Sequence, residues 1–427
     1  MARMQLYSPA PLDPFSPQIN PRDRMMPTHG PQIVWRTDQP TRRPPARSFL
    51  PLLRAAVAAR PDRPDLLRDL AVALRDDRRW VEIHDLLSPL AEKGGLTPAL
   101  ACELAQAAIA CDQPDLALRV LAPEIAGTAR DARRQRVLAL YALNRIDEAR
   151  TAAAQVLDEN PSDSMVLGAF ANDCLTHGAA EDLASLCQGA IDGGVGSTLH
   201  LAYLSAALSL AGRTSDVVRL IDPEYLCRRI ELDSGLIDNE ELTQAILTHP
   251  ALAPSPETKP TYGRNLRLEG LASVEHPAIR NLLAVVRRQV DDYLAERLNA
   301  PHPLIAHRPQ TARLQGWALV LSDDGHEETH IHPQGWLTVV YYARVPTSET
   351  RGAEREAPPP GSLAFGPWPR FIGESLPDFP RWRVEPQDGT LLIFPSFLGH
   401  GTIPTGVGEP RICVALDVLP CDQAPTP

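Results

Sequence analysis

A repeat of about 34 residues runs through the first half of the chain and limits how this half can fold. Five segments share a polar turn, a helix start and then a residue expected to pack inward: DDRRWVEIHDLL, CDQPDLALRVL, LNRIDEARTAAAQVL, THGAAEDLASLC and AGRTSDVVRLI. The inward positions are Ile83, Ala117, Ala149, Leu183 and Val217, spaced 34, 32, 34 and 34 residues apart. This period is typical of stacked helix–turn–helix units, which bury their apolar stripes against their neighbours. The sequence from about Ser48 to Tyr225 therefore predicts a curved α-solenoid.

The clearest unit is LYALNRIDEARTAAAQVLDENPSD, from Leu140 to Asp163. It resembles a tetratricopeptide repeat, including a small residue in the second helix and Pro161 after that helix. The resemblance implies tetratricopeptide-like helix pairs over residues 49–248. Concave surfaces of such arrays commonly bind peptides or proteins, so a peptide or protein partner is expected there. A spacer or a dimerisation arm is the alternative, and the sequence sets no oligomeric state.

The segments on either side of the repeats differ in composition. Residues 1–48 contain ten prolines and seven arginines against three aspartates, with no helical or strand period, and are predicted to be a disordered tail. The Pro-rich stretch HPALAPSPETKPTYG, His249 to Gly263, marks a domain boundary. Apolar residues at helical spacing then predict a core-facing helix from Pro277 to Leu298.

Short strands separated by Gly, Pro and Asp follow after Pro309: LQGWALVLS, GWLTVVYYARV, GSLAFG, GTLLIFPS and RICVALDVL. Many short strands of this kind predict an antiparallel double sheet such as a jelly roll. The whole chain is therefore predicted to be a multidomain α + β protein with a helical first half.

Charge and cysteine usage exclude several classes of function. The formal net charge of −11 argues against nucleic-acid or anionic-membrane partners. The seven cysteines form no CxxC pair, which favours a reduced, cytoplasmic setting. We find no secretory signal at the N-terminus and no apolar run long enough to cross a bilayer.

Two histidines two residues apart, His330 and His332, end the stretch GHEETHIH, Gly325 to His332. In an extended strand alternate side chains share a face, so His326, Glu328, His330 and His332 would point the same way. A divalent metal is one partner for such a face, because neutral imidazole is a common metal ligand. A solvated polar face on an edge strand is the alternative.

A second stretch carries a lone histidine and an arginine at the start of a strand. His400 lies in FPSFLGHGTIP, just after an apolar strand. In the following strand RICVALDV, one face is predicted to carry Arg411, Cys413, Ala415 and Asp417. The small residues leave space beside the guanidinium, where a carboxylate could bind bidentately. An exposed arginine at the start of a strand is the alternative.

Together these blocks resemble iron- and 2-oxoglutarate-dependent oxygenases, and specifically a 2OG-Fe(II) oxygenase family distantly related to prolyl hydroxylases and often found after tetratricopeptide repeats in bacterial proteins. HIHPQGWLTVVYYARVP, GSLAFG and FPSFLGHGTIPTGVGEPRICVALDV carry the resemblance, which spans residues 255–420. It implies a double-stranded β-helix (jelly roll) with flanking helices. Fe(II) and 2-oxoglutarate are the implied cofactors. The residues it assigns are His330 and His400 as iron ligands, Arg411 as the 2-oxoglutarate anchor, and Tyr341 or Tyr342 with Thr402 in the co-substrate pocket.

Position 332 departs from the usual pattern. Most such enzymes have His-x-Asp or His-x-Glu, and here the pair is His-x-His. Either His332 binds the metal directly, giving a three-histidine site of His330, His332 and His400, or Glu328 supplies the carboxylate while His332 takes a supporting role. We favour the first.

The predicted function is a 2-oxoglutarate-dependent dioxygenase that hydroxylates a peptide, protein or small-molecule substrate recruited by the repeats. A three-histidine oxygenase that does not use 2-oxoglutarate is one alternative. A non-catalytic repeat scaffold with a metal-binding or degenerate oxygenase domain is the other.

Overall fold

The computed structural model of the 427-residue chain describes residues 33–37, 46–122, 129–233, 235–298, 301–346, 360–376 and 378–421. The chain divides into two compact units, Pro40–Ala179 and Ala180–Pro427 together with Met1–Gln39. This division differs from the predicted limits at 248 and 255, because the last helices of the repeat region group with the sheets. The predicted limits of the two folds stay predictions.

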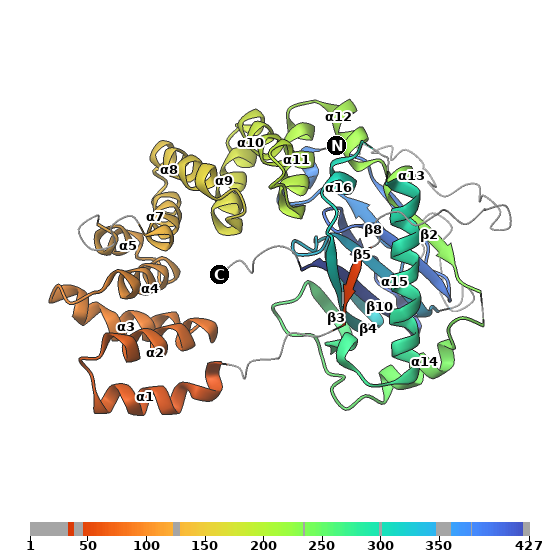
Figure 1. Ribbon diagram of the computed structural model, residues 1–427, viewed down its shortest axis with the longest axis horizontal. Coiled ribbons are helices and arrows are strands. Elements are labelled where there is room, and N and C mark those ends of the chain that lie inside the picture. Colours follow the sequence, from red (N-terminus) through yellow and green to blue (C-terminus); the bar gives the residue numbers. More distant parts are fainter. Residues whose placement is uncertain are drawn as a thin grey trace, which may run out of the picture. The chain divides into compact units, whose positions relative to one another are not determined.

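The unit Pro40–Ala179 is helical (Figure 1). After a short 3-10 turn at Ala46–Phe49, its helices are α1 (Leu50–Ala59), α2 (Pro64–Asp76), α3 (Trp80–Glu92), α4 (Pro98–Ala110), α5 (Pro114–Val120), α7 (Arg130–Ala142), α8 (Ile146–Glu159) and α9 (Ser164–Thr176). The second unit begins with α10 (Ala180–Asp192), α11 (Thr198–Leu210) and α12 (Thr214–Ile221).

Five short turns repeat the period found in the sequence. Each joins two successive helices and contains one residue in the left-handed region: Arg78, Asp112, Asn144, Gly178 and Gly212, with φ of 55°, 59°, 55°, 75° and 72°. Glycine adopts this conformation without a steric penalty, and Asn and Asp tolerate it better than most residues. The five predicted inward positions, which follow these turns, are at most 1% exposed. The predicted helix-pair repeat is therefore confirmed.

The rest of the second unit combines helices with two sheets. Its helices are α13 (Pro223–Leu226), α14 (Asn239–Leu247), α15 (Pro277–Arg297) and α16 (Pro303–Ala306), with short 3-10 turns at Leu271–Ser273 and Arg370–Ser375. Helix α15 lies along the larger sheet (Figure 1). The His276 side chain caps it by accepting a hydrogen bond from the backbone N–H of Ala278. Its predicted apolar face is buried, as expected for a core-facing helix: Ile279, Leu282, Leu283, Val286, Val290, Tyr293 and Leu294.

The two sheets form the predicted jelly roll. The larger has the order β1-β4-β10-β5-β8-β2, with β3 also paired to β4, and the smaller has the order β7-β6-β9. The strands are β1 (Val34–Arg36), β2 (Arg228–Glu231), β3 (Thr261–Glu269), β4 (Thr311–Glu327), β5 (Leu337–Arg344), β6 (Leu363–Gly366), β7 (Trp382–Val384), β8 (Thr390–Pro395), β9 (Gly399–Thr402) and β10 (Gly406–Pro420). This architecture agrees with the predicted double-stranded β-helix with flanking helices.

The prediction of a structureless tail is wrong for residues 46–48, which lie in the 3-10 turn Ala46–Phe49, and for one short strand. Val34–Arg36 forms β1 and pairs in parallel with Thr311–Arg313 of β4. The Trp35 indole N–H donates to both carboxylate oxygens of Asp291, each at 3.1 Å. A pattern of three residues is too short to show a strand period, so the sequence did not reveal it. The other residues of this predicted tail, apart from 33, 37 and 46–48, lie outside the described ranges.

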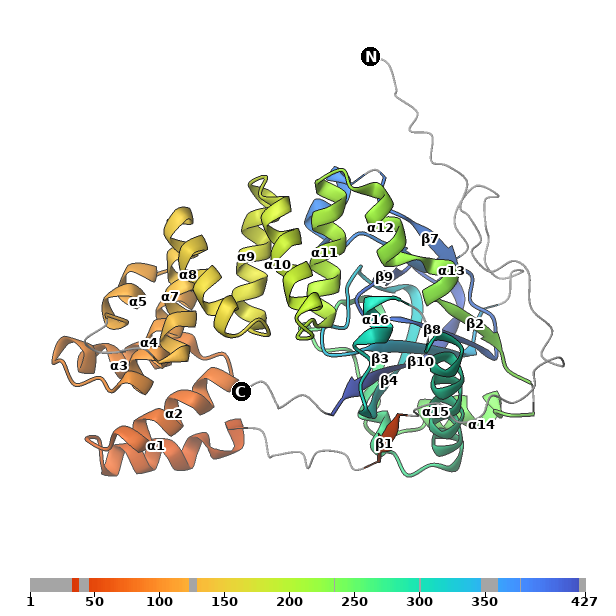
Figure 2. The ribbon, with the colours of Figure 1, turned by 45° about the horizontal axis from the view of Figure 1, so that its top comes forward.

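Helix α11 lies beside the sheets within the second unit (Figure 2) and contacts the loops that precede β5 and follow β6. The Thr198 hydroxyl donates to the Gly335 carbonyl, in the loop before β5. The Tyr203 and Trp368 rings lie 5.3 Å apart between centroids. One helix of the repeat region therefore packs against the loop that follows His332. Among the described residues, no helix is long and apolar enough to cross a membrane.

Candidate metal centre

The segment between β4 and β5 brings two histidines to the end of β9. Strand β4 ends at Glu327, so the alternation expected for residues 326–332 fails beyond that point. Instead, His330 and His400 form an isolated antiparallel bridge through two backbone hydrogen bonds of 2.9 and 3.0 Å. The backbone N–H of His332 donates to the Ser396 carbonyl at 3.0 Å. Main-chain bonds thus fix both histidine positions against the β8–β9 connection.

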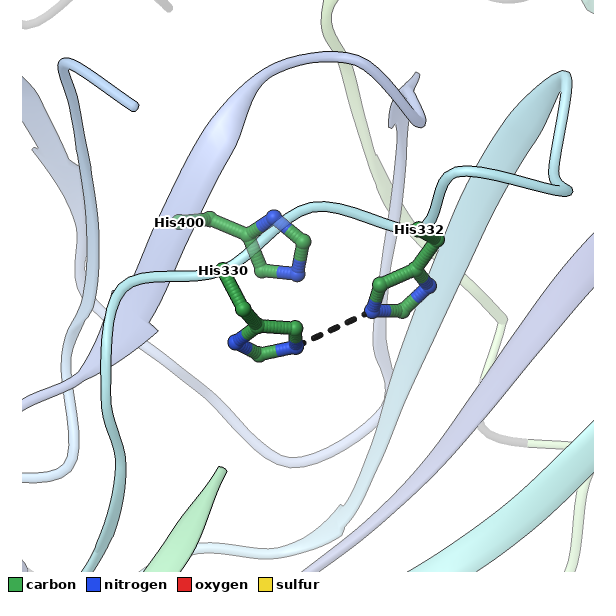
Figure 3. Close-up of side chains that lie close together, drawn as sticks. All are labelled: His330, His332 and His400. Carbon is green, nitrogen blue, oxygen red and sulfur yellow. Dashed lines mark hydrogen bonds between the residues drawn. The ribbon is translucent and has the colours of Figure 1, made fainter. Parts of the chain in front are cut away.

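The three imidazoles point toward one another (Figure 3). Their candidate ligand atoms all lie within 4.8 Å of one another. The Nε2 atoms of His330 and His332 are 3.1 Å apart. Two imidazole nitrogens bound at a right angle with metal–nitrogen bonds of roughly 2.1 Å would lie about 3.0 Å apart. The cluster therefore has the donor type and the spacing of a metal site.

The outer nitrogen of each ring is held by an oxygen acceptor. His330 Nδ1 lies 2.7 Å from the Glu328 carbonyl, and His400 Nδ1 lies 2.9 Å from the Leu398 carbonyl. His332 Nδ1 lies 2.5 Å from Asp417 Oδ1. Since a carbonyl or carboxylate oxygen only accepts, each Nδ1 carries the proton and each Nε2 presents its lone pair. This is the tautomer that a metal ligand needs.

Burial favours the neutral form of two of the imidazoles, His330 and His400. His332 is 7% exposed and His400 is 3% exposed. Burial lowers the pKa of His330, and burial followed by the neighbouring histidines lowers the pKa of His400 well below its usual value. Uncharged imidazole is the form that binds a divalent cation, so burial favours the metal-binding form of these two rings.

The carboxylate of Glu328 does not join the cluster. In the part of the chain that the structure describes, the group able to hold a metal consists of His330, His332 and His400. Glu328 contributes its carbonyl to His330 instead of its side chain. His326 also lies apart, since its ring stacks on Tyr262 at 5.9 Å between centroids. Of the two alternatives for position 332, the geometry favours the three-histidine set.

Arg411 is buried on the same face of β10 as Asp417. It is 1% exposed, and its Cζ lies 4.9 Å from the centre of the Tyr342 ring. Its Nε and Nη1 atoms find no hydrogen-bond acceptor among the described residues. Buried charged donors without acceptors are costly, so the geometry fits an anion with two oxygens. A dicarboxylic acid such as 2-oxoglutarate meets this need.

The two predicted tyrosines point to opposite faces of β5. The Tyr341 hydroxyl donates to Asn239 Oδ1 of α14 at 2.5 Å, so this ring does not line the space beside Arg411. Tyr342 faces Arg411, and its buried hydroxyl has no partner in the described ranges. The structure therefore separates the two tyrosines that the sequence left as alternatives, and Tyr342 is the one beside the guanidinium.

Two threonines lie near the end of β9. Thr402 is buried on β9, opposite Leu363 of β6. Thr405 was not predicted. Its hydroxyl is buried and has no partner among the described residues, and a Cβ built on Gly361 would meet both Thr405 and Arg411, at 3.4 and 3.3 Å. Thr405 is thus a further candidate donor beside Arg411, and no sequence pattern marks it.

Fold and site together define a jelly-roll domain with three converging histidines that could hold a metal and with a buried arginine on β10. Residues 315–417 match the family model described as "Putative 2OG-Fe(II) oxygenase". This part of the chain is similar to that family, whose description names Fe(II) and 2-oxoglutarate, and the histidine cluster fits an iron site of that kind.

Solved structures similar to the chain include enzymes and a repeat protein. A Pseudomonas putida prolyl-4-hydroxylase has 14% identity and a TM-score of 0.33, covering 49% of this chain and 98% of the other. A Trichoplax adhaerens prolyl hydroxylase in complex with a hypoxia-inducible-factor peptide has 17% identity and a TM-score of 0.32, covering 49% and 90%. A TPR protein of Thermus thermophilus has 20% identity and a TM-score of 0.29, covering 41% and 88%. Comparison with curated proteins gives no match.

Proposed function

We propose that the chain is an Fe(II)- and 2-oxoglutarate-dependent dioxygenase that hydroxylates a C–H bond of its substrate. The observation that carries the proposal is the presence, in one domain, of three converging imidazoles and of a buried guanidinium. Two nitrogens of this guanidinium, that of Arg411, have no hydrogen-bond acceptor among the described residues. The histidines alone would suit several metal chemistries. A buried arginine without an acceptor favours, among these metal enzymes, the class that binds an oxo acid as co-substrate, because the guanidinium can bind the carboxylate of that acid.

His330, His332 and His400 would hold Fe(II) through their Nε2 atoms, and their Nδ1 bonds keep the rings in that orientation. Arg411 would bind the carboxylate of 2-oxoglutarate that lies away from the metal. Tyr342, Thr402 and Thr405 are proposed to complete this pocket with hydroxyl groups. When bound, Fe(II) and 2-oxoglutarate would supply the oxidation: dioxygen would convert 2-oxoglutarate to succinate and carbon dioxide, with one oxygen atom entering succinate and the other the substrate C–H bond.

Aromatic rings around the histidines favour a site that excludes water. Phe394 packs edge-on against His400 with centroids 4.8 Å apart, and Trp317 lies 5.4 Å from His332. Both rings are at most 7% exposed. An apolar wall beside the ligands lowers water access and strengthens local electrostatic interactions.

The test is anaerobic binding followed by turnover. Wild-type protein should bind Fe(II), and 2-oxoglutarate should then produce a visible charge-transfer absorption band. Admission of air should yield succinate. His330→Ala should lose the metal, and Arg411→Ala should keep the metal but lose the band at moderate 2-oxoglutarate. A protein that binds Fe(II) yet shows neither band nor succinate would point to a three-histidine oxygenase without 2-oxoglutarate. A protein that binds no metal would leave only the scaffold alternative.

We also propose that the substrate is a peptide or protein, with the repeats recruiting it. Support comes from the repeat architecture and from helix α11, which contacts Gly335 in the loop after His332. The measurement is mass spectrometry of cell-extract peptides and proteins incubated with active protein or with His330→Ala. Oxygen-atom additions present only with the active protein would identify the substrate. Additions confined to small molecules would exclude a protein substrate.

A further inference from the structure

We propose that Asp417 is a positioning residue of the metal centre that delivers, through His332, the negative charge which a carboxylate ligand would otherwise bring. The inference rests on the proposed function, because it concerns how the same three histidines hold Fe(II).

The three histidines differ in what holds their outer nitrogens. His330 and His400 donate to neutral main-chain carbonyls, whereas His332 donates to the carboxylate of Asp417 at 2.5 Å. A carboxylate acceptor makes an imidazole a stronger electron donor and fixes its orientation. The charged acceptor, Asp417, thus binds the outer nitrogen of His332, the one histidine that occupies the position of the usual carboxylate ligand.

The surroundings of Asp417 are those of a buried anion that needs a cation. Asp417 is 7% exposed, and its ionic contact within the described ranges is with His332. The Thr338 hydroxyl donates to the same carboxylate oxygen at 3.1 Å. A buried carboxylate with only neutral donors is costly. Coordination of a divalent cation by His332 would place positive charge next to Asp417 and compensate for that cost.

Three strands and their ends hold this cluster. Asp417 of β10 and Thr338 of β5 are directly opposed in the antiparallel pair. The hydroxyl of Thr338 lies 2.8 Å from that of Ser396, the residue after β8, and both hydroxyls are buried. A second layer of side chains built on strands fixes a ligand more firmly than one on loops. The arrangement therefore suits a residue that orients a metal ligand.

The first test compares two buried substitutions in metal titrations without air. Asp417→Asn keeps the shape but removes the charge, and we expect Fe(II) affinity to fall roughly 10–100-fold, in the range found for such outer partners. The charge-transfer band with 2-oxoglutarate should move to shorter wavelength, because a metal with less electron donation is harder to oxidise. Asp163→Asn, which removes the charge of a buried carboxylate paired with Arg134 in the repeat region, should leave both the band and the Fe(II) affinity unchanged.

A double-mutant cycle separates action through His332 from a general effect of charge or folding. In a His332→Ala background, Asp417→Asn should cause little further loss of metal affinity. Urea unfolding with a chelator reports whether each variant is folded. Wild-type metal affinity in Asp417→Asn, or an equal loss in both backgrounds, would overturn the inference while leaving the proposed function intact. Absence of metal binding by the wild-type protein would instead remove both.

Discussion

Replacing Arg411 by methionine should weaken the binding of 2-oxoglutarate without lowering the stability of the protein. Methionine has a similar unbranched length and no charge. The buried guanidinium has two nitrogens without acceptors among the described residues. Leaving a buried donor unpaired costs about 1–3 kcal/mol, so two such atoms cost roughly 2–6 kcal/mol in the ligand-free protein. The stacking of Arg411 on Tyr342 offsets about 0.5–2 kcal/mol of this.

Arg411→Met should therefore leave the free energy of unfolding unchanged or raise it by a few kcal/mol when 2-oxoglutarate is absent. Two hydrogen bonds to a charged partner contribute about 1.5–3 kcal/mol each, so the same variant should weaken 2-oxoglutarate binding by roughly 10²–10⁴-fold. Urea unfolding with a chelator measures the first quantity. Calorimetric titration of the metal-loaded protein measures the second.

Arg411→Lys is the matched control, because it keeps the charge but cannot bind a carboxylate bidentately. We expect it to bind 2-oxoglutarate more weakly than wild type and more tightly than Arg411→Met. A methionine variant that unfolds several kcal/mol more easily yet keeps wild-type 2-oxoglutarate affinity would refute the reasoning. Arg411 would then be a structural residue.

Three further predictions concern pH, the tyrosines and the repeats. Burial lowers the pKa of His400, so below about pH 6.5 the unfolded chain binds a proton at this residue that the folded chain does not bind. The free energy of unfolding of the metal-free protein should therefore decrease as the pH is lowered below about 6.5. Urea titrations measure this dependence, and His400→Leu should make it less steep. Tyr342→Phe should weaken 2-oxoglutarate binding measured by calorimetry, whereas Tyr341→Phe should leave it unchanged and lower stability by about 1 kcal/mol through loss of one hydrogen bond. Leu183→Ala, at a fully buried repeat position, should cost about 2–5 kcal/mol in chemical unfolding without changing Fe(II) affinity.

The repeats and the order of the site residues were readable because both depend on local spacing. Ile83 and Val217 stand far apart in the chain, yet each follows its turn by the same number of residues and is buried. The alternation in β10 likewise separates the face of Arg411 and Asp417 from the face of Ile412, and both faces have the predicted members. Such patterns are local because period and side-chain direction are set by the backbone.

Other features depend on contacts between distant residues. The strand pattern before His332 predicted Glu328 on the metal face, but β4 ends at Glu327 and the chain then follows hydrogen bonds to the β8–β9 connection. The partner of Asp417 is 85 positions away in the sequence, at His332. Alternation placed Asp417 on the inner face but could not say which histidine would reach it. The position of Glu328 and the partner of Asp417 both depend on how distant strands pair with one another, and no local pattern in the sequence encodes that pairing.

Strand β10 links the two halves of the proposed chemistry. One face carries Arg411 near its start and Asp417 near its end, with Cys413 and Ala415 between them. A guanidinium for the co-substrate and a carboxylate for a metal ligand are thereby held at a fixed separation by a single extended backbone. Because side chains alternate, a shift of one residue in the pairing of β10 would move both charges to the face of Ile412, Val414 and Leu416, whose side chains are fully buried. The buried apolar residues of the opposite face make that shift too costly to occur. They therefore fix the register of β10, and the same register keeps Arg411 and Asp417 on the face of the site.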